Sequence, residues 1–97
     1  MAANTIVVLD PTAVPRDLRH PMAQRLAGLG GRKIGFLWNN KANGDTLFNR
    51  LEKLLRQKYE ISDALHRRKP DASIPAEVQI YDELATSADA VVLGLGD

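Results

Sequence analysis

Three short segments with the hydrophobic pattern of strands lie in the chain from residue 32 onward. The first lies in residues 32–38 and is nearly all apolar from residue 34, which is typical of a strand covered on both faces. Residues 59–65 alternate apolar and polar side chains, which predicts a strand near the edge of a sheet. Residues 90–93 are apolar and predict the last strand.

Two segments with helical periodicity separate these runs. The first follows a polar loop at residues 39–45, where Asn43 or Asp45 can cap the helix. Pro75 suits the first position of the second helix. The apolar stripe of the first helix comprises Leu47, Phe48, Leu51, Leu54 and Leu55, and that of the second comprises Val78, Tyr81, Leu84 and Ala85.

The resulting order, β-α-β-α-β, predicts an α/β fold. Strands that alternate with helices indicate a mostly parallel sheet with right-handed crossovers, here half of a doubly wound sheet. Before it, residues 5–9 carry β-branched and apolar side chains, which predict a strand that pairs with an edge of this sheet or of a partner chain. Prolines and glycines in residues 10–32 favour an extended arm. The predicted organisation is an arm with a strand (1–31) and an α/β half-domain (32–97).

Composition narrows the classes of function. The 97 residues are 44% hydrophobic and 26% charged, as expected of one globular domain. A net charge of +1 gives no basic field that would favour nucleic acid or a membrane surface. The absence of cysteine excludes disulfides, thiolate metal ligands and a cysteine nucleophile within these residues. No apolar run approaches the roughly 18 residues of a membrane span, and residues 1–4 carry no basic signal region, so the cytoplasm is the expected location.

The loop at residues 39–45 is the first candidate binding site. It follows a predicted strand and opens a helix, whose backbone N–H groups bind anions. Lys41 adds a positive charge, and the amides of Asn40 and Asn43 can orient a carboxylate or amide substrate. The alternative is that Asn, Gly and Asp serve here only as loop and cap residues.

The segment Gly94-Leu95-Gly96-Asp97 is the second candidate. Active sites of open α/β sheets lie just beyond the carboxyl ends of the strands, and this turn follows the last strand. We therefore expect it to lie close to the loop at 39–45, with Gly94, Gly96 and Asp97 contributing to substrate binding. A dinucleotide-binding fingerprint would need a third glycine on a following helix, so the nucleotide signal is weak.

The basic cluster His66-Arg67-Arg68-Lys69 has two interpretations. It can bind an acidic substrate or partner, or it can be solvated surface at the end of a strand. The two histidines, His20 and His66, have no spacing that pairs them with a carboxylate, so each is expected to be structural or exposed. No metal site and no catalytic residue is predicted, and the residues define no cofactor.

Several short segments together match the pattern of a known family: Leu9-Asp10-Pro11-Thr12-Ala13, Lys33-Ile34-Gly35-Phe36-Leu37, Asn40-Lys41-Ala42-Asn43, Arg67-Arg68-Lys69-Pro70, Ser73, Pro75-Ala76, Asp89-Ala90-Val91-Val92 and Gly94-Leu95-Gly96-Asp97. Their order and spacing resemble the N-terminal part of the UGSC family of selenocysteine or cysteine proteins. In that family the segment similar to residues 94–97 is followed by selenocysteine or cysteine, then Gly-Ser-Cys, and then by a second half of the α/β domain. That redox motif is not among these 97 residues.

The resemblance implies the N-terminal half, or a small subunit, of a thiol- or selenol-dependent enzyme that acts on a small molecule. The family's broader likeness is to selenoprotein components of amino-acid reductases. The implied partner is a second chain, or a missing C-terminal half, that carries the cysteine or selenocysteine. A UGA codon after Asp97 and a naturally split enzyme would both produce this pattern. Either implies an oligomer that is inactive without its other part.

Two other classes of function remain open at this stage. The chain can be a non-catalytic interaction subunit that completes a partner's sheet. It can also be a small nucleotide-binding module, which the incomplete glycine pattern disfavours.

Overall fold

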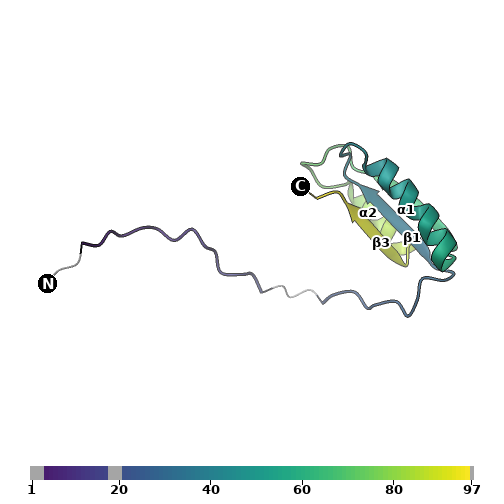
Figure 1. The fold of residues 1–97 in the computed structure, drawn as a ribbon, viewed down its shortest axis with the longest axis horizontal. Coiled ribbons are helices and arrows are strands. Elements are labelled where there is room, and N and C mark those ends of the chain that lie inside the picture. The colour runs from purple at the N-terminus through teal and green to yellow at the C-terminus, as the bar shows by residue number, and fades with distance from the viewer. Residues whose placement is uncertain (1–3, 18–20, 97) are drawn as a thin grey trace.

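The computed structural model describes residues 4–17 and 21–96, and an α/β body follows an N-terminal arm (Figure 1). The body contains β1 (Lys33–Trp38), α1 (Gly44–Tyr59), β2 (Asp63–Arg68), α2 (Val78–Ser87) and β3 (Ala90–Gly94). All strands are parallel, and their order in the sheet is β2-β1-β3. The predicted β-α-β-α-β fold is confirmed. No helix in the described ranges has the length and apolar character needed to cross a membrane.

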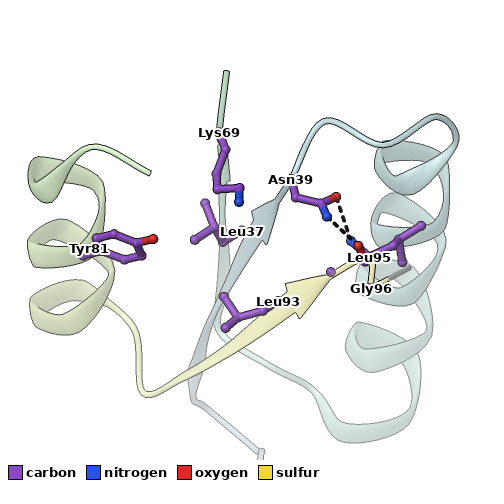
Figure 2. A pocket seen from close by; sticks show the side chains of 8 residues that line it. Leu37, Asn39, Lys69, Tyr81, Leu93, Leu95 and Gly96 are labelled. Atoms are coloured by element: carbon purple, nitrogen blue, oxygen red, sulfur yellow. Dashed lines mark hydrogen bonds between the residues drawn. The ribbon is translucent and has the colours of Figure 1, made fainter. Parts of the chain in front are cut away.

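The two helices lie on opposite faces of the sheet (Figures 1 and 2). The chain moves from β1 to one neighbour and then crosses to the other, and right-handed crossovers in opposite directions place their helices on opposite faces. Side chains alternate along β1, so Ile34 and Phe36 pack with Phe48 of α1, whereas Leu37 packs with Leu84 of α2. The centre of β1 is buried on both faces, as its apolar run predicts.

The second strand begins later than the sequence predicts. Helix α1 continues to Tyr59, and Glu60 ends it in a left-handed conformation with φ 56°. Ile61 is then buried in the core before β2 starts at Asp63. The basic residues 66–68 therefore lie inside the strand and not beyond its end, which corrects the predicted position of the cluster.

The second helix also differs from its prediction. It begins at Val78, so Pro75 precedes it and does not occupy its first position. Val78 is exposed, while Ile80 and Leu84 face the core. Of the predicted apolar stripe only Leu84 is buried, since Tyr81 and Ala85 are exposed like Val78. Ala76, from the loop before the helix, is the other buried residue of this segment.

The strand expected over residues 5–9 does not form within this chain. In the structure these residues belong to an exposed arm with no helix or strand, which extends away from the body (Figure 1). The longest dimension of the chain is 73 Å, against 31 and 28 Å in the other two directions. The arm joins the body at Leu29, which packs against the core, and at Gly31, whose N–H donates to the Glu60 carbonyl. A β-branched run alone was not enough for a strand, because no edge lies beside it.

Close packing of α2 on the sheet depends on Gly35. A Cβ at this position would lie 2.8 Å from Leu84 Cδ2 and 3.2 Å from Ala88 Cβ, whereas a Cβ at Gly28 would meet nothing within 4 Å. Leu84 is buried and cannot turn away into solvent. We expect Gly35→Ala to lower the free energy of unfolding by about 1–3 kcal/mol, as overpacking does. In urea unfolding Gly28→Ala serves as the control, and equal midpoints for the two variants would contradict this account.

Candidate functional site

The carboxyl ends of β1 and β3 are joined by the side chain of Asn39, the first residue after β1. Its Nδ2 donates to the Leu95 carbonyl, and the Leu95 N–H donates to its Oδ1 at 2.8 Å. The Asn39 N–H also donates to the Gly94 carbonyl at 2.9 Å. The amide thus continues the β1–β3 pairing one step beyond the strands (Figure 2). We call this arrangement the Asn39 clasp.

The clasp brings the two predicted site segments together. The expectation that the loop at 39–45 lies beside the turn at residues 94–96 is confirmed. Asp97 lies outside the described residues, and so does His20. Asn39 itself was missed as a candidate. Its position directly after a central strand was the available signal, but the residues that follow it in the loop offered more obvious chemistry.

The loop after Asn39 has a strained and well-braced backbone. Asn40 and Asn43 both have φ 68°, in the left-handed region that asparagine tolerates better than most residues. The Trp38 Nε1–H donates to the Lys41 carbonyl at 2.7 Å, and a Cβ at Gly44 would collide with the Trp38 indole. Asn43 occupies the N-cap position of α1 but makes no side-chain capping bond, so its predicted capping role is wrong.

A cavity of about 480 Å³ opens on one side of the clasp. Lys41 and Asp71 are the charged residues that line it, together with Asn39, Ala72, Ser73, Leu95 and Gly96. Hydrogen bonds from the Ser73 N–H and hydroxyl lower the pKa of Asp71, and the nearby Lys69 and Lys41 lower it further. Asp71 is therefore a carboxylate at neutral pH, and the cavity wall carries both signs of charge.

A second cavity of about 300 Å³ opens on the α2 side of the clasp (Figure 2). Its apolar part is formed by Leu37 and Leu93, and its polar part by Lys69 and Tyr81. The Lys69 Nζ donates to the Ala72 carbonyl at 3.3 Å. Asn39, Leu95 and Gly96 line both cavities, so the clasp forms the border between them. Lys69 belonged to the basic cluster, but its place at the rim depends on the strand register.

The remaining site candidates lie around this rim. The Asn40 Nδ2 donates to the Pro70 carbonyl at 3.2 Å and so ties the loop to the segment after β2. Gly94 ends β3, and a Cβ there would lie 3.1 Å from Phe48 Cζ, so a small residue is required. Gly96 is exposed at the mouth of both cavities.

Two residues of the basic cluster in β2, His66 and Arg67, contact side chains of the two helices. The His66 ring stacks on Phe36 with centroids 4.7 Å apart and contacts Glu52, a carboxylate partner that the sequence spacing did not indicate. Hydrogen bonds from His66 and then Arg56 lower the pKa of Glu52. Arg67 forms a two-point ion pair with Glu83 on α2. Within the described ranges no group of His, Asp and Glu has the arrangement of a metal site.

Fold and site together define a class of protein. It is an α/β protein with a parallel sheet, helices on both faces, and cavities at the carboxyl rim between β1 and β3. In sheets of this order that point is where the connections leave toward opposite faces, and ligands bind there.

Comparison with known proteins identifies the family. The chain belongs to the UGSC family, whose model matches residues 7–97. The resemblance inferred from the separate motifs is thereby confirmed. No curated protein and no solved structure gives a significant match to the chain.

Proposed function

We propose that this chain is the substrate-orienting part, an N-terminal half or small subunit, of a thiol- or selenol-dependent enzyme that acts on a small molecule. The nucleophilic cysteine or selenocysteine comes from a segment that follows Asp97 or from a second chain. Membership of the UGSC family and the lack of cysteine in these 97 residues support this division of roles. The chain alone is then inactive in thiol chemistry.

The Asn39 clasp is the observation that carries the proposal. It holds Leu95 and Gly96 on the border between the two cavities. A nucleophile placed just after this turn would face a substrate in either cavity. A thiolate or selenolate at that position is favoured if a helix begins there, because the helix N-terminus stabilises a negative charge.

The other rim residues then position the substrate. Lys41 lines the larger cavity and can pair with a substrate carboxylate. The amides of Asn40 and Asn43 can fix its orientation, while Gly94 and Gly96 keep the approach open. Asp97 follows Gly96 in the sequence and is the proposed source of a further carboxylate for the substrate.

The test compares Lys41→Ala with Arg68→Ala in the enzyme reconstituted with its thiol-bearing part. Arg68 lies on β2 beside a separate cavity of about 190 Å³. We expect Lys41→Ala to lower kcat/KM about 10- to 100-fold, because loss of one charged hydrogen bond costs roughly 1.5–3 kcal/mol. Arg68→Ala is expected to stay within about twofold of wild type.

Two controls make this comparison decisive. Both variants must fold and assemble as the wild type does, and the 97-residue chain alone must show no turnover. If Lys41→Ala leaves kcat/KM within about twofold of wild type and Arg68→Ala lowers it tenfold or more, the residues at 39–45 serve only as a loop and helix cap, and Arg68 is the binding residue. The DNA after codon 97 decides which thiol-bearing part to use: an in-frame UGA followed by Gly-Ser-Cys codons, or an adjacent gene that begins with such a motif.

A non-catalytic interaction subunit is the second candidate. The exposed apolar side chains of the arm and of β3 favour it, since a chain that only completes a partner's sheet would present such surfaces. It predicts that neither Lys41→Ala nor Arg68→Ala changes the activity of the assembled enzyme.

A further inference from the structure

The N-terminal arm carries an apolar segment that the body leaves uncovered. Ile6, Val7, Val8 and Leu9 are between 72% and 100% exposed. Burial of such a side chain contributes about 1.5–3 kcal/mol, so burying these four residues on a partner surface would contribute a large favourable free energy. Three of the four are β-branched, which favours a strand, and a strand needs a partner edge.

The two free edges of the sheet differ in chemistry. The β2 edge is flanked by charged groups on both faces, which is how proteins discourage strand addition. These are the pairs Glu52–His66, Arg56–Asp63 and Arg67–Glu83. On β3, Val91 and Leu93 lie on the α2 face, as Gly35 and Leu37 do, and Leu93 is 69% exposed. The sequence of β3 is AVVLG, so the strand has no charged side chain of its own that would discourage strand addition at this edge.

Helix α1 extends the apolar surface of the β3 edge. Glu52 and Arg56 contact β2, so they mark the side of α1 that faces that strand. At about 100° per residue, Leu47 and Leu54 lie on the opposite side of the helix, toward β3. Both are about half exposed. A strand added to β3 would therefore contact Leu47 and Leu54 on the α1 face of the sheet and Leu93 on the α2 face.

Residues 5–9 match that position because, apart from Thr5 at its start, both faces of such a strand are apolar. We propose that residues 5–9 of a second copy of this chain add to β3 as a fourth strand, and that two copies exchange their arms reciprocally. The same edge and the same segment occur in every copy, so the contact is self-complementary and closes as a dimer. This inference goes beyond the proposed function and concerns the 97-residue chain, because a C-terminal half or partner chain that paired with β3 would compete with the arm for the same edge.

The course of the arm favours a second copy over the same chain. The arm leaves the body beside β2, where the Ser62 N–H donates to the Arg32 carbonyl, and it runs away from the body (Figure 1). The radius of gyration is 20.2 Å, whereas a compact chain of this length has about 12–13 Å. Residues 10–28 can span about 60 Å, which is enough to reach a neighbouring body.

The first test is the oligomeric state of the purified 97-residue chain by sedimentation over a range of concentrations. We expect a dimer for the wild type. Val8→Lys should shift it to monomer, because a charge would enter the strand position. Val14→Lys is the matched control: it places the same charge on another exposed valine of the arm, outside the segment, and it should remain a dimer. A wild type that is monomeric throughout, or a dimer unaffected by Val8→Lys, would overturn the proposal.

Disulfide trapping identifies which copy supplies the arm, since the chain has no cysteine of its own. Val7→Cys and Leu93→Cys are made in separate chains, mixed and oxidised. We expect an interchain disulfide, and little of it when Val14→Cys replaces Val7→Cys. If Val7→Cys and Leu93→Cys crosslink only when both are in one chain, the arm docks on its own body and the exchange is refuted. Neither test measures thiol chemistry, so each result is independent of the enzymatic proposal.

Discussion

Phe36→Ala is expected to lower the free energy of unfolding by about 3–5 kcal/mol, the usual loss for a large aromatic removed from a core. Phe36 is completely buried at the centre of β1. Its ring lies 5.5 Å from the Phe48 ring and 4.7 Å from the His66 ring, so it joins α1 to two strands. A domain of this size has only about 5–15 kcal/mol in total, so the loss is a large part of its stability.

Urea unfolding followed by circular dichroism measures this effect. Tyr59→Ala is the control, because Tyr59 is an aromatic residue at the exposed end of α1, and it should cost less than about 1 kcal/mol. Phe36→Leu should recover part of the loss by filling some of the cavity. If Phe36→Ala and Tyr59→Ala have the same midpoint, the α1-side core does not hold the body together as described.

Asn39→Ala is expected to open the turn after β3 without unfolding the body. The substitution removes both side-chain hydrogen bonds to Leu95. The half-buried N–H and carbonyl of Leu95 then lack these partners, at a cost of about 1–3 kcal/mol. Because the loss is confined to the end of the sheet, it should appear as local opening. The exchange rate of the Leu95 amide hydrogen should rise about 10- to 100-fold, since 1.4 kcal/mol corresponds to a factor of ten.

Hydrogen exchange measured by NMR distinguishes this local effect from a global one. Asn40→Ala is the matched control, as Asn40 is the next residue and bonds only the Pro70 carbonyl among its described hydrogen bonds. It should leave Leu95 exchange unchanged. Asn39→Asp keeps the Oδ1 acceptor but replaces the donor with an oxygen, so it should fall between wild type and alanine. Unchanged Leu95 exchange in Asn39→Ala would show that the clasp does not hold the turn.

The element types were accessible from the sequence because they depend on local periodicity. The apolar run of β1 correctly predicted a buried strand, and the helical periodicity correctly predicted α1, although Leu47 and Leu54 of its stripe are about half exposed. Boundaries were less accessible where a single residue ends an element. Nothing in the pattern shows that Glu60 adopts a left-handed conformation and ends α1, and the start of β2 therefore lies four positions later than predicted.

The arm illustrates the limit of propensity. Residues 5–9 have the composition of a strand, but strand formation requires backbone hydrogen bonds from a neighbour. Composition cannot say whether an edge lies within reach. In the structure none does within the same chain, and the segment stays exposed.

By itself the sequence determined the fold class and the family pattern, and it predicted a candidate site at the rim of a parallel sheet. Only the tertiary structure decided which side chains form that rim: Asn39 and Lys69 entered it, whereas Arg67 turned to Glu83. The reason is the range of the interactions. Periodicity is set by residues a few positions apart, but Asn39 and Leu95 are 56 positions apart. They meet only because β1 and β3 pair in one register, with Trp38 opposite Gly94.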